Sequence, residues 1–215
     1  MSASVPIRHP PAVLIDVLPG GLARDVGLVV GAAAFVGVVG NVSVPLPFTP
    51  VPLTLGTFAV LLAGASLGPL RAFLSMSTYL VAGAAGLPWF AERASGWSFP
   101  SFGYIVGFVV AATVVGALAR RGADRHVVRT AASMALGSLI IYAIGVPWLM
   151  LSLGADASTA VSLGLTPFLV GDALKALAAA LLLPAVWRSI GPPTQHPTDG
   201  EGRNSEARQG AADAP

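Results

Sequence analysis

Apolar residues dominate six stretches of the chain, and Gly and Pro punctuate the boundaries between them. The runs are continuously apolar instead of alternating, which favours helices over the strands of a membrane barrel. Several runs are near the short end of the roughly 17–25 residues that a membrane-crossing helix needs. We therefore predict six transmembrane helices: Asp25–Asn41, Leu53–Leu67, Leu70–Gly86, Phe102–Ala119, Val127–Leu153 and Pro167–Arg188.

The composition places the chain among integral membrane proteins. Of its 215 residues, 54% are hydrophobic and 10% are charged, whereas a soluble domain carries about 25% charged residues. One globular core of this size cannot bury that much apolar surface, so the predicted fold class is an all-α, polytopic membrane bundle. The chain has no cysteine, which excludes a disulfide scaffold and thiolate metal sites.

The arginines divide unequally between the two sides of the predicted bundle. If both termini are cytoplasmic, ten of the eleven arginines fall on the inner side and only Arg93 falls on the outer side. This imbalance agrees with the positive-inside rule. We therefore expect a multi-pass protein with both ends in the cytoplasm.

Polar tails flank the predicted membrane domain. The first 20 residues lack the order of a cleaved signal peptide, and their prolines disfavour a helix. Residues 189–215 are polar, mixed in charge and rich in Pro and Gly, a composition typical of disordered segments. The expected organisation is an N-terminal cytoplasmic tail over 1–24, a six-helix domain over 25–188 and a disordered cytoplasmic tail over 189–215.

The last predicted helix carries both an acid and a base. The stretch PFLVGDALKALAAALLL contains Asp172 and Lys175, and the latter is the only lysine in the chain. Residues three apart share a helix face, and a charge near the bilayer centre costs roughly 2.5–3.5 kcal/mol on insertion scales. We therefore expect both side chains to face the bundle interior or a cavity open to the outer side.

Two interpretations of this pair remain open from the residues alone. The pair could neutralise itself and lock the bundle, or it could bind a solute that enters from outside. Lysine is a compact donor with three N–H groups, and the aspartate supplies acceptors beside it. This combination suits a neutral group with both N–H and C=O, such as an amide or a urea.

The outer loops supply candidate walls for such a site. The segment NVSVPLPFTPVPLTL contains four closely spaced prolines, so we expect a stiff, extended flap that Phe48 helps to make apolar. The loop LPWFAERASGWSFPSFGY is rich in aromatic residues, among them Trp89 and Tyr104. Such aromatics fit either an interfacial belt or the wall of an apolar ligand site.

Small residues recur along the first predicted helix. In DVGLVVGAAAFVGVVG, Gly27 and Gly31 are four apart, and Ala33 and Gly37 repeat that spacing beside Ala34. Faces of this kind let helices approach closely in membranes. The face serves either packing within this bundle or docking onto another membrane protein.

Four stretches together resemble the BioY family, the biotin-binding S components of energy-coupling-factor (ECF) transporters. They are VPLPFTPVPLTL, FAVLLAGASLGPLRAFLSMSTYLVAGAAGLPWFA, GYIVGFVVAATVVGALARRG and GLTPFLVGDALKALAAALLLP. The resemblance runs from about residue 25 to residue 188. The Pro-rich segment and the PF-x2-GD-x2-K ending are together quite specific.

The resemblance implies an S-component-like bundle that captures biotin from outside. The family's aspartate and lysine fall on Asp172 and Lys175, and its GY position falls on Gly103 and Tyr104. The Pro-rich segment matches the family's lid, and the small-residue face resembles its docking surface. The expected substrate-binding residues are Asp172, Lys175, Tyr104, Gly103, Trp89, Phe48 and Arg93. The expected partner-docking residues are Gly27, Gly31, Ala33, Ala34 and Gly37.

The sequence departs from the family's pattern at three places. Members often read TLQT where this chain has TLGT at Gly56, and GPTGGY where it has FPSFGY with Phe102. Glu92 and Arg93 stand where members often carry an asparagine. These departures affect the expected loop contacts and ligand selectivity, and they leave the residues of the last helix intact.

The expected function is high-affinity biotin uptake by the substrate-binding subunit of an ECF-type transporter in a bacterial cytoplasmic membrane. The resemblance implies a transmembrane coupling subunit and separate ATPase subunits as partners, and the absence of a G-x4-GK-[ST] phosphate loop from this chain is consistent with ATP being used by those subunits. No cofactor, metal or nucleic-acid partner is expected. An enzyme is not expected, because the spans contain no Cys, His or Glu. The alternative is a small proton-coupled secondary transporter for another polar solute, with Asp172 as the proton carrier.

Overall fold

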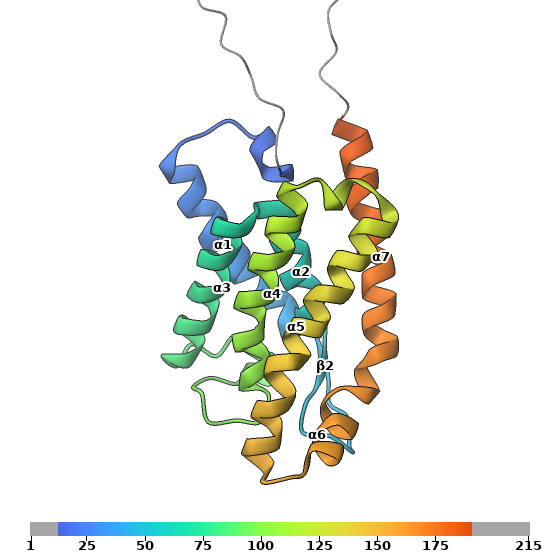
Figure 1. Ribbon diagram of the computed structural model, residues 1–215. Coiled ribbons are helices and arrows are strands. Elements are labelled where there is room, and N and C mark those ends of the chain that lie inside the picture. The colour runs from blue at the N-terminus through green and yellow to red at the C-terminus, as the bar shows by residue number, and fades with distance from the viewer. Residues whose placement is uncertain (1–12, 191–215) are drawn as a thin grey trace, which may run out of the picture.

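The structure, a computed structural model, describes residues 13–190 of the chain. Six long helices form a bundle (Figure 1): α1 (Leu22–Gly40), α2 (Gly56–Leu67), α3 (Pro69–Ala84), α4 (Phe102–Arg120), α5 (Val127–Leu153) and α7 (Leu169–Ile190). Shorter helical segments connect them: η1 (Leu14–Val17), η2 (Ala91–Arg93), η3 (Ala123–Arg125), α6 (Ala157–Gly164) and η4 (Thr166–Phe168). The predicted all-α bundle is confirmed.

Helix α4 occupies the middle of the bundle, between α3 and α5 (Figure 1). Of its apolar window 61% is buried, compared with 17% for α1. Glycines allow its neighbours to approach its backbone. A Cβ added at Gly64 would lie 2.7 Å from the carbonyl oxygen of Ala112, and one added at Gly107 would lie 3.0 Å from the Cα of Ile141. The helices around α4 are therefore held at backbone-to-backbone contact.

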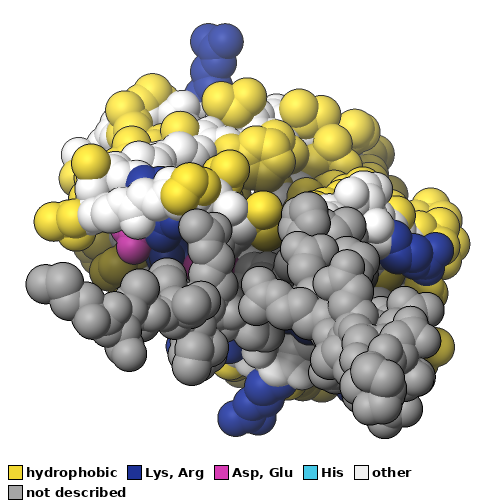
Figure 2. All heavy atoms as spheres, turned by 90° about the horizontal axis from the view of Figure 1, so that it is seen from above, with side chains coloured by type: hydrophobic (Ala, Val, Ile, Leu, Met, Phe, Trp, Pro, Cys, Tyr) yellow, Lys and Arg dark blue, Asp and Glu magenta, His cyan; other side chains and the backbone are white. Residues whose placement is uncertain are grey.

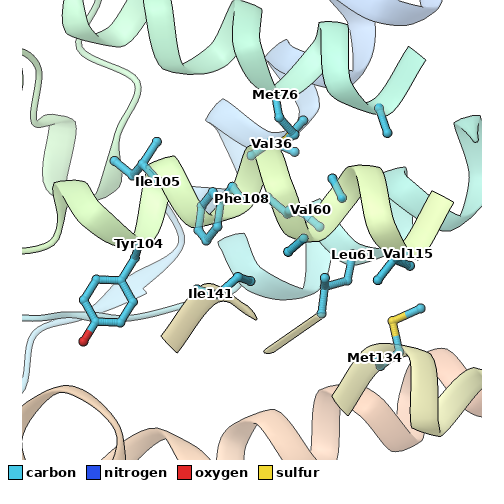
Figure 3. Close-up of a cluster of buried hydrophobic side chains, with 14 of the residues drawn as sticks. Val36, Val60, Leu61, Met76, Tyr104, Ile105, Phe108, Val115, Met134 and Ile141 are labelled. Atoms are coloured by element: carbon cyan, nitrogen blue, oxygen red, sulfur yellow. The ribbon is translucent and has the colours of Figure 1, made fainter. Parts of the chain in front are cut away.

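One hydrophobic cluster joins the helices that surround α4 (Figure 3). Val36 of α1, Met76 of α3 and Ile141 of α5 are each at most 1% exposed. The residues labelled in Figure 3 come from α1 to α5: Val36, Val60, Leu61, Met76, Tyr104, Ile105, Phe108, Val115, Met134 and Ile141. This cluster fixes the frame from which the polar side chains of α5 and α7 project.

The outer surface of the bundle is apolar, as expected for a membrane protein. Leu22, Val38 and Val128 are 72–81% exposed, and hydrophobic side chains cover much of the periphery in Figure 2. Within the described part of the chain, four segments are long and apolar enough to cross a membrane: Leu22–Gly40, Phe102–Arg120, Val127–Leu153 and Ala157–Ile190. An exposed apolar surface of this extent is stable in contact with lipid hydrocarbon but not in contact with water.

Helices α2 and α3 are shorter than the bilayer core. They contain 12 and 16 residues, which correspond to about 18 and 24 Å of helix, whereas the hydrocarbon core is about 30 Å thick. The six predicted helices are thus all present, but α2 is too short to cross the hydrocarbon core. Gly56 and Thr57, at its N-terminus, line a cavity within the bundle.

The start of α2 is the main correction to the predicted helix boundaries. Leu53–Thr54, predicted as helix, forms strand β2, which pairs antiparallel with β1 (Ser43–Val44). Pro50 and Pro52 cannot continue a helix, and the chain stays extended through Thr54. There the hydroxyl of Thr54 accepts the backbone N–H of Gly56 at 3.0 Å. The segment predicted as a stiff, extended flap is thus a short hairpin.

Both described ends of the chain lie at the same end of the bundle, opposite α6 and the hairpin (Figure 1). The predicted N-terminal tail, 1–24, includes a packed segment, because Val13 is 2% exposed and Arg71 of α3 forms an ion pair with Asp16 of η1 at 2.9 Å. Helix α1 begins at Leu22 rather than at Asp25. The predicted disordered tail lies outside the described residues from position 191 onward.

Candidate functional site

Four polar side chains from three helices meet inside the bundle. The ammonium of Lys175 donates to Asp172 Oδ1 at 3.0 Å and to Thr57 Oγ1 at 2.9 Å. The Tyr142 hydroxyl donates to Asp172 Oδ2 at 2.5 Å, and Thr57 Oγ1 lies 3.5 Å from Asp172 Oδ1. Thr57 belongs to α2, Tyr142 to α5 and the charged pair to α7. The pair expected from the sequence is therefore part of a larger network.

The network lies deep enough to be shielded from bulk water. The Asp172 and Lys175 side chains are 9% and 15% exposed, and Tyr142 is buried. A buried pair of opposite charges is tolerated when additional hydrogen bonds satisfy the remaining donors and acceptors. Thr57 and Tyr142 provide those bonds from the neighbouring helices.

A cavity opens beside this network and is otherwise mostly apolar. Its walls come from α1 to α5, the hairpin, η2, the loop before α4, η4 and α7. Six of the lining residues are aromatic. The lining residues are Gly40, Val51, Pro52, Thr54, Gly56, Thr57, Tyr79, Ala91, Phe99, Ser101, Tyr104, Ile105, Phe108, Tyr142, Phe168, Asp172 and Lys175. An apolar chamber with a few convergent polar groups is the usual form of a small-molecule site.

The hairpin is tied over one side of this cavity. Val51 and Pro52 line the chamber, and the hydroxyl of Thr49 donates to the carbonyl oxygen of Leu163, in α6, at 2.8 Å. The hydroxyl of Tyr104, another lining residue, donates to the adjacent carbonyl of Gly164 at 2.8 Å. The last turn of α6 therefore contacts both the hairpin and the cavity wall.

Among the residues expected to bind substrate, the structure brings Asp172, Lys175 and Tyr104 to the cavity. Gly103 lies instead at the contact between α4 and α5, where an added Cβ would be 2.2 Å from the Cβ of Trp148. Trp89 packs on Gly37 and donates its indole N–H to the carbonyl of Tyr79 at 3.0 Å. These two residues support wall residues without lining the cavity themselves.

The remaining expected contacts, Phe48 and Arg93, lie at the surface. Phe48 is 59% exposed at the turn of the hairpin. Arg93 is exposed, has a positive φ of 59° and donates its backbone N–H to the side-chain oxygen of Asn41 at 3.1 Å. Neither residue lines the cavity. The neighbouring Ala91 does line it, so the turn that carries Arg93 lies close to the cavity wall.

The small-residue face of α1 divides into two parts. Ala33 and Gly37 are buried, whereas Gly27, Gly31 and Ala34 are exposed. Gly27 and Gly31 have open space beyond them and line a shallow apolar groove with Phe35 and residues of α2. Only Gly27, Gly31 and Ala34 among the five expected docking residues are therefore accessible to a partner in this structure.

Sequence reasoning missed Thr57 and Tyr142. Each is a hydroxyl-bearing residue within an apolar stretch, and a buried tyrosine usually finds a hydrogen-bond partner. That signal marks Tyr142 as a residue needing an acceptor but does not identify Asp172 as that acceptor. Within residues 13–190, no group of three or more His, Cys, Asp or Glu side chains could hold a metal ion.

Comparison with known sequences identifies the chain's relatives. A model of the BioY family matches residues 9–192. The Probable biotin transporter BioY of Pyrococcus horikoshii is 39% identical over 163 residues, which cover 74% of this chain and 94% of the relative. The Putative biotin transporter BioYB of Bacillus subtilis is 32% identical over 193 residues, covering 85% of this chain and 94% of the relative.

A solved structure shares the fold. The crystal structure of the S-component for biotin from an ECF-type ABC transporter matches with a TM-score of 0.69 and 21% sequence identity. The match covers 77% of this chain and 92% of the other. The arrangement of six long helices is thus one already seen in an S-component.

Proposed function

Because the chain belongs to the BioY family, we propose that it captures biotin as the substrate-binding membrane subunit of an ECF-type transporter. The observation that carries this proposal is the polar network of Asp172, Lys175, Thr57 and Tyr142 at the edge of an apolar cavity. Relatives named biotin transporters support the choice of ligand. The similar fold of a biotin S-component supports the type of transporter.

The chemistry of the cavity matches the two halves of biotin. Its ureido ring is neutral and carries both N–H and C=O groups, which pair with a carboxylate acceptor and an ammonium donor. Its fused ring and aliphatic chain are apolar and fit beside Tyr104, Phe108 and Phe168. A buried donor that finds no partner costs roughly 1–3 kcal/mol, so an analogue without the urea is expected to bind less well.

The loop residues are proposed to act around the cavity's rim. The hairpin that carries Phe48 closes over the ligand, and the turn that carries Arg93 borders the ligand's carboxylate end. Trp89 and Gly103 set the positions of Tyr79 and α5, since they pack on those elements. Phe48, Arg93, Trp89 and Gly103 thus shape the site from outside the lining shell.

We place the protein in a bacterial cytoplasmic membrane with both termini inside. The end of the bundle from which both chain ends leave also carries the arginine-rich connection between α4 and α5, including Arg120 and Arg121, whereas Arg93 lies in the connection between α3 and α4. Figure 2 looks onto that arginine-bearing end. The positive-inside rule assigns it to the cytoplasm, which makes the cavity accessible from outside.

The proposed partners are a transmembrane coupling subunit and separate ATPase subunits. The groove lined by Gly27, Gly31 and Phe35 offers a close approach for a partner helix, because small side chains let helix backbones come together. The subunit itself is proposed to need no cofactor and to catalyse no reaction. Energy from ATP reaches it through the partner subunits.

Binding of biotin to the purified protein tests this function directly. Lys175→Ala and Asp172→Ala should each weaken biotin binding, since a hydrogen bond to a charged group contributes about 1.5–3 kcal/mol, or roughly 10- to 150-fold in Kd. Thr113→Val is the control, because that hydroxyl donates to the carbonyl of Val109 in its own helix at 2.7 Å and does not line the cavity. Wild-type affinity in both site variants would refute the site assignment.

Uptake measurements in cells distinguish the alternative transporter class. The ECF-type subunit should lose uptake when the ATPase subunits are deleted and keep it briefly when the proton gradient is collapsed. Uptake that stops with an uncoupler and needs no ATPase partner would instead indicate proton-coupled transport through Asp172.

A further inference from the structure

We propose that Tyr142 and Thr57 are positioning residues that determine which hydrogen-bonding groups the Asp172–Lys175 pair offers to a ligand. This inference rests on the proposed function and deepens it. The pair is fixed from two other helices, α5 and α2, through the hydroxyls of Tyr142 and Thr57. Asp172 and Lys175 already neutralise each other, so neither hydroxyl is needed to balance a charge. Each hydroxyl instead orients one of the two charged groups.

The hydrogen bonds of Lys175 leave one donor for the ligand. An ammonium has three N–H groups. One donates to Asp172 Oδ1 and a second to Thr57 Oγ1. Because Lys175 also lines the cavity, the third N–H is the one free to meet a ligand's carbonyl oxygen. Without the Thr57 hydroxyl, the ammonium has two free donors and no fixed direction.

The hydrogen bonds of Asp172 restrict its carboxylate in the same way. Oδ2 accepts from Tyr142, and Oδ1 accepts from Lys175 with the Thr57 hydroxyl nearby. A carboxylate has about four acceptor sites, so most are already taken before any ligand arrives. The remaining acceptor site of the carboxylate suits one ligand N–H group next to the carbonyl that Lys175 binds. It does not suit a second cation.

The Tyr142 hydroxyl is held in place by its surroundings. Tyr142 is 8% exposed, and its ring meets the ring of Tyr104 edge to face, with centroids 6.2 Å apart. The Tyr142 hydroxyl is therefore held at a fixed position on α5. Its hydrogen bond fixes the orientation of the Asp172 carboxylate on α7. The network consequently selects a neutral cyclic urea over a cationic analogue of the same shape.

The test compares biotin with 2-iminobiotin, whose ring carbonyl is replaced by an imino group. At neutral pH this ring is a protonated guanidine, which has no acceptor for Lys175 and adds a positive charge. Competition against labelled biotin on the purified full-length protein gives both affinities. Tyr142→Phe and Thr57→Val keep side-chain shape and remove only the hydroxyl. Thr57→Ser restores it, and Thr113→Val is the matched control.

The expected result is a loss of about tenfold or more in biotin affinity for Tyr142→Phe and Thr57→Val, with a smaller loss for 2-iminobiotin. The preference for biotin therefore falls in both variants and recovers in Thr57→Ser. A merely structural defect would weaken both ligands equally and leave the preference unchanged, which would overturn the inference. Unchanged affinities would overturn it as well. Wild-type protein that fails to bind biotin would instead refute the proposed function itself.

Discussion

Substitution of Gly103 by alanine tests whether this position serves packing between helices or contact with the ligand. Gly103 is the second residue of α4, and a Cβ placed on it would lie 2.2 Å from Trp148 Cβ and 2.6 Å from Trp148 Cγ. Trp148 Cβ is fixed to the backbone of α5, so no side-chain rotation relieves the clash. Ordinary carbon contacts begin near 3.4 Å, and α5 must therefore move away from α4 by about 1 Å.

The expected loss of folding stability follows from this displacement of α5. Overpacking a well-packed contact costs about 1–3 kcal/mol, and a backbone-fixed clash belongs at the upper end of that range. Alanine's better helix propensity offsets at most about 1 kcal/mol of this. The free energy of unfolding should therefore fall by about 2 kcal/mol, which corresponds to a decrease of roughly 4–8 °C in Tm for a domain of this size.

Thermal unfolding in detergent, followed by tryptophan fluorescence, measures this change, and a biotin titration accompanies it. The indole of Trp148 donates to the carbonyl of Phe99 at 3.1 Å, and Phe99 lines the cavity, so affinity should fall along with stability. Gly27→Ala is the control, because a Cβ there meets nothing within 4 Å. An unchanged Tm for Gly103→Ala with weakened binding would refute the packing argument and favour direct ligand contact.

Two further predictions concern the hairpin and the α4–α5 connection. Thr49→Val removes the bond to the carbonyl of Leu163, worth about 0.5–1.5 kcal/mol, so bound biotin should dissociate about two- to tenfold faster in stopped-flow measurements. Thr49→Ser should behave like the wild type, and equal rates in all three proteins would contradict a closing role for this bond. In η3, burial raises the pKa of Asp124, whose Oδ2 accepts from Trp187 while its Oδ1 has no hydrogen-bond partner among the described residues. The folded protein thus holds this proton more tightly than the unfolded chain, and stability falls as pH rises from the ordinary carboxyl pKa of about 3.9 towards the raised value. Asp124→Asn lacks this titration, so its Tm relative to the wild type should increase over that pH interval. A difference that stays constant with pH would count against a buried, titrating Asp124.

The sequence by itself determined the membrane class, the six long helices and the position of the charged pair. These features depend on local properties: the length and hydropathy of a run, the count of arginines in a loop, and the three-residue spacing that puts Asp172 and Lys175 on one helix face. Helix α5 begins and ends at the predicted residues, Val127 and Leu153. Local signals of this kind survive folding because the bilayer imposes the same requirement on every span.

The short elements were less predictable, because their sequences carry signals for more than one type of secondary structure. The predicted helix from Leu53 gave way to a hairpin, since Pro50 and Pro52 keep the chain extended up to Thr54. Helix α6 was not predicted, because Ala157–Gly164 is only eight residues long and interrupts its apolar residues with serine and threonine. Its start is set by Asp156, which accepts the backbone N–H of Thr159 at 2.7 Å.

Only the tertiary structure decided which side chains share the cavity. Thr57, Tyr142 and Asp172 are separated by 85 and 30 residues along the chain, and they meet because α2, α5 and α7 are rotated towards one another. The same rotation turns Gly103 towards Trp148 and away from the cavity. The physical reason is that the hydrophobic pattern of a lipid-embedded helix fixes its length but scarcely its rotation, because both lipid and protein neighbours are apolar. Rotation is set by close contacts such as that of Gly107 with Ile141, which exist only once the helices have packed.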